Sequence, residues 1–474
     1  MTTRTFSLAD QLEFAQLSGD YNPLHVDPVA ARRSMFGGVV VHGIHSLLWA
    51  LDIWSRDRPL PVGISSIHAN FTRSIRLGDV VTCSLMTERA GQAQLHLLVD
   101  GSVSTKVKIN WQPSQLESLN LFTAGFPQRQ EPRVLAMHDA DNASGTVPLY
   151  LDPECVARLF PHLLGAASPL QLAQLLATTR LVGMECPGLY SFYSSVEVHF
   201  RTDEDTTPVL SYNVTKLDTR YGVVIMSITS PNVTGTVTAF FRPPPYNQIG
   251  YAAIQDIVGC REFAGQRALV IGGSRGLGEV TAKLLAAGGA DVKLTYHQGA
   301  ADARRVVAEI TSTGGRAGCV PFDVLDHTSR IDDILDHEWT PTHLYYLASP
   351  FISRGRKGGF SGPLFQTFCN YYVLGFSRLF QHLCLRGLTR VFYPSTVFVD
   401  ELPADMSEYA AAKIAGEELC QFLEKAYPAI ILQKPRLPRM ATDQTVSFVP
   451  GENRDPVPVL LEHLRNMANE NVVC

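Results

Sequence analysis

Residues 18–25 read Ser-Gly-Asp-Tyr-Asn-Pro-Leu-His and place a carboxylate, Asp20, five positions before an imidazole, His25. Asn22 and Pro23 stand between them, and an Asn-Pro pair indicates a turn instead of a continuous helix. Such a turn lets the two side chains converge on one point. A carboxylate and an imidazole that meet in this way can hold and activate one water molecule.

The residues that follow predict a helix packed on an antiparallel sheet. Residues 36–43 form a second glycine-rich segment, Phe-Gly-Gly-Val-Val-Val-His-Gly, and an apolar helix is expected from His45 to about Arg56. Apolar and polar residues then alternate, as is typical of half-buried strands, in residues 67–71, 80–85, 94–99 and 104–109. This order predicts one α+β domain over residues 1–115.

Residues 18–25 and 36–43 together resemble the MaoC-like, (R)-specific enoyl-thioester hydratases, which have the hot-dog fold. The resemblance implies that Asp20 and His25 activate the water, that Asn22 shapes the turn, and that the backbone N–H near Gly43 donates to the thioester carbonyl oxygen. It also implies an acyl-CoA or acyl-carrier-protein thioester as substrate. A thioesterase is the alternative for a hot-dog domain, and the Asp-x-Asn-Pro-x-His pattern argues against it.

An isolated Asp and His would favour a plainer interpretation, in which Asp20 caps a turn and His25 is a buried, hydrogen-bonded imidazole. Here Ser18-Gly19 precedes the pair, Asn22-Pro23 separates it and His42-Gly43 follows it. This context favours the catalytic interpretation.

Beyond a polar connector, at about residues 113–147 with Pro127 and Pro132, the first layout is repeated over residues 148–242. A helix is expected over residues 169–176, and strands are expected over residues 191–200, 209–217, 222–230 and 236–241. This second copy has no Asp-x-Asn-Pro-x-His pattern. We therefore predict a second, non-catalytic hot-dog domain that completes a pseudo-dimer, with an unrelated all-β or α+β domain as the alternative.

After a linker that begins at Pro243-Pro244-Pro245, residues 262–474 alternate strand and helix patterns, which predicts a parallel, doubly wound α/β sheet of the Rossmann type. The strand at residues 267–271 leads into a glycine-rich loop and then a helix, and a second strand follows at residues 291–297. Glycines in this context let a pyrophosphate approach the helix N-terminus. The loop residues predicted to bind the cofactor are Gly272, Ser274, Arg275, Gly276, Leu277 and Gly278.

The cofactor is predicted to be NADP(H). When the adenosine ribose carries a free 2′-hydroxyl, an Asp or Glu usually ends the second strand, but this chain has Tyr296, His297 and Gln298 there. Of these, His297 is predicted to bind the cofactor. Arg275 in the glycine loop also favours a 2′-phosphate, although it could be a solvated loop charge. Asp323, after the third strand, suits the adenine amino group.

Tyr409 and Lys413 lie one helical turn apart,. A nearby ammonium lowers the pKa of a phenol, which can then protonate a developing alkoxide. Residues 267–413 as a whole resemble the short-chain dehydrogenase/reductases. The resemblance implies that Tyr409 and Lys413 are catalytic and also bind the cofactor, and that Ala348 binds it at the nicotinamide. It further implies that Ser395 orients the carbonyl, although Thr396 has the more usual spacing.

Three departures from that family stand out. The strand before the nicotinamide ends in residues 346–350, Tyr-Leu-Ala-Ser-Pro, instead of an Asn-Ala-Gly type turn. The family has an asparagine at one position of a helix near the site. Here Asn370 lies close to that position in the sequence, and Tyr372 is the alternative residue for the position itself. Residues 435–438, Pro-Arg-Leu-Pro, replace the usual Pro-Gly turn. Cofactor binding is therefore expected, with a domain that binds cofactor without turnover as the alternative.

Composition limits the remaining possibilities. A chain of 474 residues is expected to form two or three domains,. A net charge of −5 gives no reason to expect nucleic acid or an anionic membrane as partner,, and no run of 18 apolar residues predicts a membrane span. Nine scattered cysteines without a CxxC pair argue against disulfides and a zinc site,. We expect a cytoplasmic protein without a metal.

The two resemblances share an intermediate. A reductase makes a 3-hydroxyacyl thioester from a β-ketoacyl thioester, and a hydratase run backwards converts that product into an enoyl thioester. We therefore predict a bifunctional reductase and dehydratase of fatty-acid or polyketide type. Alternatives are hydration followed by oxidation in degradation, a dehydrogenase domain that acts as an enoyl reductase or on an unrelated substrate, and one that binds cofactor without turnover. A homodimer or larger homo-oligomer is expected from the family.

Overall fold

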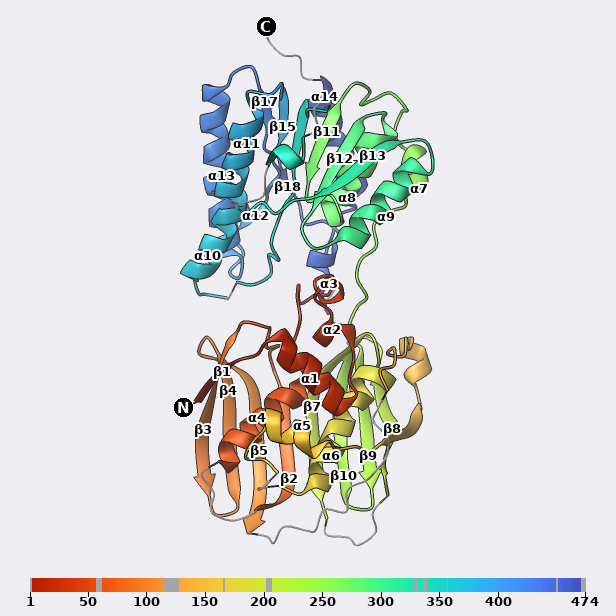
Figure 1. Cartoon of the computed structure of the whole chain (residues 1–474), viewed down its shortest axis with the longest axis vertical. Helices are drawn as coiled ribbons and strands as arrows, with labels where there is room; N and C mark the ends of the chain where they lie inside the picture. The colour runs from red at the N-terminus through yellow and green to blue at the C-terminus, as the bar shows by residue number, and fades with distance from the viewer. Residues whose placement is uncertain are drawn as a thin grey trace. The chain divides into compact units, whose positions relative to one another are not determined.

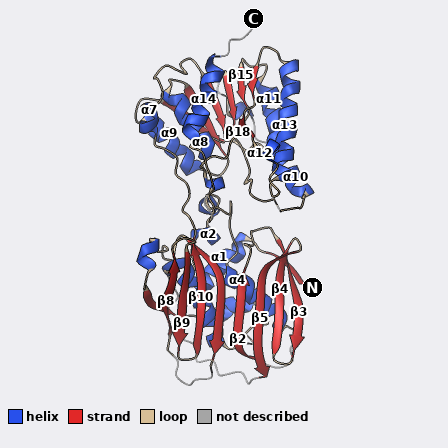
Figure 2. Cartoon of the chain, turned by 180° about the vertical axis from the view of Figure 1, so that it is seen from behind, coloured by secondary structure: helices blue, strands red, loops and turns tan. Residues whose placement is uncertain are grey.

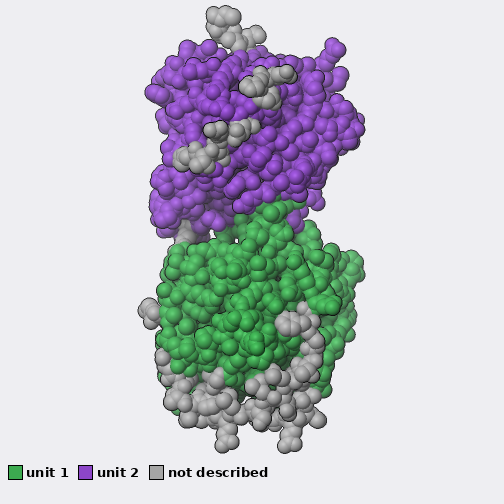
Figure 3. Space-filling model, viewed as in Figure 1, with its two compact units in different colours: residues 1–244, 447–449 green, residues 245–446, 450–474 purple. Residues whose placement is uncertain are grey.

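The computed structural model, drawn in Figure 1, describes residues 2–56, 62–113, 128–164, 167–201, 207–326, 331–335, 339–355, 357–448 and 451–469. The chain forms two compact units, which Figure 3 colours separately: Met1–Pro244 with Ser447–Val449, and Pro245–Val446 with Pro450–Cys474. Each unit has its own sheet and its own hydrophobic core.

The first unit contains one antiparallel sheet of ten strands in the order β1-β3-β4-β5-β2-β7-β10-β9-β8-β6. The strands are β1 Thr2–Thr5, β2 Val62–Phe71, β3 Val80–Arg89, β4 Gln92–Val99, β5 Ser102–Pro113, β6 Ser144–Pro148, β7 Ser191–Phe200, β8 Val209–Asp218, β9 Val223–Ser230 and β10 Val233–Phe241. The order β1-β3-β4-β5-β2 recurs as β6-β8-β9-β10-β7. This repeated topology confirms the predicted double hot-dog and excludes an unrelated second domain.

Strands β2 and β7 join the two halves into one sheet. They pair antiparallel, with Ile67 opposite Val198 and Ala69 opposite Val196. These four side chains are buried, whereas the intervening His68 is not. Since successive side chains of a strand point to opposite faces, one face of the sheet is apolar and covered.

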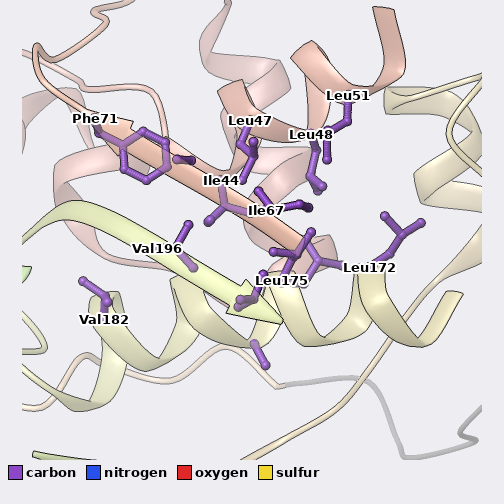
Figure 4. Packing of buried hydrophobic residues seen from close by; sticks show 14 of the residues in the cluster. Ile44, Leu47, Leu48, Leu51, Ile67, Phe71, Leu172, Leu175, Val182 and Val196 are labelled. Atoms are coloured by element: carbon purple, nitrogen blue, oxygen red, sulfur yellow. The ribbon is translucent and has the colours of Figure 1, made fainter. Parts of the chain in front are cut away.

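The helices of this unit cover that apolar face. The principal ones are α1 Leu8–Ser18, α4 Gly43–Ser55, α5 Pro153–Leu159 and α6 Pro169–Arg180. Figure 1 shows them in front of the strands, and Figure 2 shows the strands in front of the helices from behind. In Figure 4, Leu47 of α4 and Leu175 of α6 lie in one cluster with Ile67 of β2 and Val196 of β7. Both repeats therefore share a single core.

The connector expected over residues 113–147 differs from the structure at its end. Residues 144–148 form β6, and Met137–Ala140 form a short 3₁₀ helix. β6 is an edge strand that pairs only with β8, and its five residues include a glycine and a proline, so its alternating pattern is weak. The part that contains Pro127 lies outside the described residues. The repeat boundaries 1–115 and 148–242 stay predictions.

The second unit is built around a parallel sheet of six strands in the order β13-β12-β11-β14-β15-β17. These strands are β11 Arg267–Ile271, β12 Asp291–Tyr296, β13 Arg316–Pro321, β14 His343–Tyr346, β15 Arg390–Phe392 and β17 Ile431–Gln433. Ala268 and Val270 belong to one buried cluster, and Leu269 and Ile271 belong to another. Both faces are thus covered, which confirms the predicted doubly wound sheet.

Helices of the second unit divide between these two clusters. Those with residues in the cluster of Ala268 and Val270 are α7 Tyr251–Gln255, α8 Gly276–Ala287, α9 Ala300–Thr311 and α14 Pro456–Asn469. Those on the opposite face are α10 Gly362–Cys369, α11 Phe376–Leu383 and α13 Ser407–Ala426. Because Tyr251 and Ile254 of α7 are buried in the core, this unit includes residues ahead of residue 262, the predicted start of this domain.

A buried ion cluster ties α8 to α9. Lys283 is fully buried, and its Nζ lies 2.8 Å from Glu279 Oε1 and 2.7 Å from Glu309 Oε2. Arg305 also pairs with Glu279, at 2.9 Å. A buried charge that loses its partner destabilises the fold strongly.

Replacing Lys283 by methionine should therefore lower the free energy of unfolding of this unit by about 3 kcal/mol, because the buried Glu279 and the partly exposed Glu309 keep their charges with less positive charge beside them,. Urea titration of the whole chain measures the change. The exposed Lys425 on α13 provides the matched control: Lys425→Met should change the free energy by less than about 0.5 kcal/mol. Equal stability of the two variants would contradict the prediction.

Candidate active sites

The first site is formed where α1 ends. Gly19 ends this helix with a positive φ of 75°, and Asn22 Oδ1 accepts from the Leu24 N–H at 3.1 Å, which caps the short helix α2, Pro23–Val26. The break predicted from Asn-Pro is thus present. It brings side-chain atoms of Asp20, His25 and His42 within 4.8 Å of one another. That spacing would also suit a metal ion, so the absence of a metal stays a prediction.

The Asp20 carboxylate is buried, with 1% of the residue exposed, and both of its oxygens are held. Oδ1 accepts from the Asn22 N–H at 3.2 Å, and Oδ2 accepts from the Thr179 hydroxyl at 2.7 Å. Burial raises the pKa of Asp20 above its usual value, while His25 and the Thr179 hydrogen bond oppose the rise. A raised pKa makes this carboxylate a stronger base than an ordinary one.

His25 is oriented by a backbone carbonyl. Its Nδ1 lies 2.7 Å from Val40 O, and because a carbonyl can only accept, Nδ1 carries the proton and Nε2 keeps a lone pair. Burial lowers the pKa of His25, although the Asp20 charge raises it. A neutral imidazole with a free Nε2 can accept a proton.

His42 and Asn22 make further contacts that hold Asp20 and His25 in place. The His42 ring stacks on the His25 ring with centroids 4.0 Å apart, and His42 Nε2 faces Asp20 O at 3.1 Å. Asn22 Nδ2 donates to Gly183 O at 2.9 Å and to Gly188 O at 3.1 Å. Asn22 therefore shapes the turn and also ties it to the second repeat.

A cavity of about 40 Å³ adjoins these groups. A water molecule needs roughly 10–15 Å³ measured in this way, so the cavity has room for the water that the chemistry requires. Both repeats line it, with Asp20, His25, Gly43, Ser46 and Phe71 from the first and Thr179, Gly183, Phe192 and Tyr193 from the second.

Gly43 stands at the start of α4, where the His42 side chain makes no capping hydrogen bond. The amides of a helix N-terminus carry partial positive charge. Negative charge that develops on a ligand in the cavity next to Gly43 would therefore be stabilised.

The second site is the glycine-rich loop between β11 and α8. A Cβ on Gly278 would overlap the carbonyl oxygen of Gly272, and Gly272 itself has a φ of 79° with Ala348 close by. Only glycine fits these two positions. Gly276 begins α8, and the side chain of the preceding Arg275 does not cap the helix. The loop and the uncapped helix start suit a diphosphate.

The other predicted cofactor residues surround this loop. Ser274 is buried, and Leu277 packs against the core cluster. His297 and Asp323 follow the ends of the adjacent strands β12 and β13, and His297 Nε2 lies 3.5 Å from Asp323 Oδ2. Arg275 Nη1 lies 3.4 Å from Asp443 Oδ2. No carboxylate ends β12, whose last residue is Tyr296.

Tyr409 and Lys413 lie on α13 and are both buried. Burial raises the pKa of Tyr409 to about 12, and a hydrogen bond with Thr396 opposes this rise. Burial lowers the pKa of Lys413 to about 7. The expected lowering of the Tyr409 pKa by Lys413 is therefore not found, because desolvation dominates both groups.

The structure does not bring Ser395 to Tyr409. Ser395 Oγ donates to Glu417 Oε1, and Arg436 of β18 (Arg436–Leu437) holds the same carboxylate at 2.6 Å. Ser395 and Thr396 form the short strand β16, and neighbouring strand residues point to opposite faces. Thr396 is consequently the hydroxyl beside Tyr409.

Tyr372, and not Asn370, contacts Lys413. A π-helical turn, Asn370–Gly375, places the Tyr372 ring 3.9 Å from Lys413 Nζ. The Tyr372 hydroxyl is hydrogen bonded with Ser349 Oγ at 2.7 Å, and Lys413 Nζ donates to Pro394 O at 2.8 Å. Asn370 is partly exposed, and its Oδ1 accepts from Gln366 Nε2 at 2.8 Å.

Sequence reasoning missed Thr179 of α6 and Gly183 of the turn that follows it, because nothing in their local sequence marks them. His42 and Thr396 did carry a signal. His42 belongs to the glycine-rich segment at residues 36–43, and Thr396 has the spacing to Tyr409 that the reductase family uses.

Comparisons with known proteins match both halves of the chain. Residues 1–108 match the MaoC like domain, and residues 266–337 match the short chain dehydrogenase family. The chain is 37% identical over 87 residues to an (R)-specific enoyl-CoA hydratase of Aeromonas caviae, which covers 18% of this chain and 63% of that protein. It is 41% identical over 85 residues to a 3-oxoacyl-[acyl-carrier-protein] reductase of Synechocystis sp., which covers 15% and 34%.

The chain thus spans less than two thirds of the length of each of these relatives. A solved short chain dehydrogenase from Burkholderia cenocepacia, in complex with NADP, is 30% identical with a TM-score of 0.36, covering 39% of this chain and 78% of that one. Among the residues that the structure describes, no helix has the length and apolar character to cross a membrane.

Proposed function

Because the chain joins a MaoC-like domain at its N-terminus to a short-chain dehydrogenase domain, we propose that it reduces a β-ketoacyl thioester and dehydrates the product. The NADPH-dependent step yields a 3-hydroxyacyl thioester, and the second step yields an enoyl thioester and water. The observation that carries the proposal is the small cavity that Asp20, His25 and Gly43 line together.

The dehydration step is assigned to the first unit. His25 Nε2 accepts the proton from the α carbon, the protonated Asp20 carboxyl gives its proton to the leaving hydroxyl, and the double bond forms as water departs. The amide at Gly43 stabilises the enolate oxygen during the step. In the reverse direction the same residues add water to the enoyl thioester.

The reduction step is assigned to the second unit. Gly272, Gly276 and Gly278 would hold NADPH, which would supply the hydride for the β-carbonyl carbon. Tyr409 gives its phenolic proton to the carbonyl oxygen, Thr396 orients that oxygen, and Lys413 stabilises the resulting phenolate. The hydroxyl formed in this way is the group that the first unit removes.

The substrate is proposed to be a CoA or carrier-protein thioester, as the names of the two curated relatives suggest for those proteins. A homodimer or larger homo-oligomer is proposed as the assembly. The chain departs from the short-chain dehydrogenase pattern at residues 346–350 and at Tyr372. The alternative proposal is therefore a second unit that binds the cofactor without reducing a substrate.

The direct test supplies acetoacetyl thioesters of CoA and of carrier protein together with NADPH. Oxidation of NADPH with successive 3-hydroxybutyryl and crotonyl products in the mass spectrum is expected. Binding of NADPH without oxidation, with any β-ketoacyl thioester, would favour the alternative. Release of free thiol would indicate a thioesterase and overturn the assignment of the first unit.

Replacing Arg275 by glutamine should reduce the preference for NADPH over NADH by about 10- to 100-fold. This is the change in affinity expected when one charge-assisted hydrogen bond to the 2′-phosphate is lost. The ratio of dissociation constants for the two cofactors, measured by fluorescence titration, checks this. Arg304→Gln removes the same charge from the exposed face of α9 and should leave the ratio unchanged. An unaltered ratio in Arg275→Gln would identify Arg275 as a loop charge that pairs with Asp443.

A further inference from the structure

The second hot-dog repeat lacks the Asp-x-Asn-Pro-x-His pattern, but it is not remote from the first site. Thr179 lies on α6 of the second repeat, and its side chain reaches Asp20, 159 positions earlier in the chain. The residue is 2% exposed, so water cannot compete freely for its hydroxyl. We propose that Thr179 is a positioning residue for Asp20 and that the second repeat completes the dehydratase site; this inference rests on the proposed dehydratase function.

The hydrogen bond has a defined direction. An ionised carboxylate can only accept, so the Thr179 hydroxyl donates to Asp20 Oδ2,. The Asn22 N–H fixes Oδ1. With both oxygens held, the carboxylate cannot rotate, and its remaining lone pairs keep one orientation toward the cavity. This is the requirement for a group that exchanges a proton with a single water.

The backbone beyond Thr179 is shaped around the same carboxylate. α6 continues into a π-helical turn, Leu181–Glu185, and such turns are rare and frequently lie at functional sites. Gly183 in this turn faces Asp20, and a Cβ there would overlap Asp20 Oδ1. Gly183 O also accepts from Asn22 Nδ2. A donor at position 179 and an open space at position 183 together accommodate Asp20.

The contact also affects the charge of Asp20. Its titratable and charged neighbours are His25 of α2, His42 at the start of α4, and Arg180 at the end of α6. Burial raises the pKa of Asp20, and the Thr179 hydrogen bond lowers it. Without the hydroxyl, the pKa of Asp20 rises further, and the ionised form that hydration needs is lost at a higher pH.

The test compares Thr179→Val, which keeps the shape and removes the hydroxyl, with Thr179→Ser, which keeps the hydroxyl. For hydration of crotonyl-CoA, Thr179→Val should have a kcat about 10- to 100-fold lower than wild type and a KM within about threefold of it. In the plot of kcat against pH, the acidic limb, where the rate falls as the pH is lowered, should move to higher pH. Thr179→Ser should restore kcat to within about threefold and return the limb to its original position.

The neighbouring Thr178 supplies the matched control. It is equally buried on α6, and its hydroxyl donates to Leu175 O at 2.7 Å, so Thr178→Val should lower stability without moving the acidic limb. If Thr179→Val and Thr178→Val have the same kcat and pH profile, the positioning role is overturned. If the wild type does not hydrate crotonyl-CoA, or Asp20→Asn does, the proposed dehydratase function itself fails.

Discussion

Replacing Asp20 by asparagine should lower kcat for the hydration of crotonyl-CoA by about 10²- to 10⁴-fold, while NADPH-dependent reduction by the same chain is unchanged. The amide keeps the shape of the carboxyl group but cannot exchange a proton with water. Because Asp20 is buried and braced on both oxygens, no exposed carboxylate can take over its role. Loss of the enoyl absorbance measures the rate.

Asp27→Asn is the matched control for this change. Asp27 lies seven residues later, where its exposed carboxylate caps helix α3, Pro28–Ala31, and asparagine caps almost as well,. Hydration by Asp27→Asn should stay within about twofold of wild type. Hydration that persists in Asp20→Asn would contradict the assignment of the first site.

Replacing Tyr409 by phenylalanine should lower kcat for reduction of a β-ketoacyl thioester by about 10²- to 10⁴-fold and leave hydration intact. The phenol is the proton donor, and the Thr396 hydroxyl cannot replace it because a serine or threonine hydroxyl is a much weaker acid. NADPH oxidation measured at saturating substrate checks the change. Tyr246→Phe, at an exposed position of the same unit, should have no effect.

The pH dependence of reduction follows from the two buried groups on α13. Burial raises the pKa of Tyr409 to about 12, so this acid stays protonated across the working range. Burial lowers the pKa of Lys413 to about 7, so the ammonium that stabilises the phenolate is lost above that pH. The rate of reduction by the wild type should therefore fall as the pH rises through about 7. A rate independent of pH between 6 and 9 would contradict a role for the Lys413 ammonium.

Much of the fold could be predicted because local patterns determine it. Period-2 alternation located the long strands of the first unit, and the strand–glycine–helix sequence located β11 and α8. The Asn22-Pro23 turn likewise indicated that Asp20 and His25 converge, since both residues belong to one short segment. In these cases the information lies within about ten residues of the feature.

The other features of the sites could not be predicted, because they depend on contacts between residues that are far apart in the sequence. Thr179 reaches Asp20 only because the β2–β7 pairing places α6 beside the first repeat. The choice between Ser395 and Thr396 depends on which face of a two-residue strand meets α13. Tyr372 lies in a π-helical turn, Asn370–Gly375, and it is this residue that contacts Lys413.

The junction between β2 and β7 has a consequence for how the protein behaves on dilution. Where two separate hot-dog chains share one sheet, a hydrogen bond such as that from Thr179 to Asp20 would exist only in the assembled pair, and it would vanish as the pair dissociates. Here a single peptide chain links both partners, so their effective concentration is fixed by the connector. Specific hydration activity should consequently be the same at nanomolar and micromolar protein. The sequences of the two repeats can then differ, because each repeat always pairs with the other one of the same chain. The first keeps the reactive groups, and the second keeps the residues that position them.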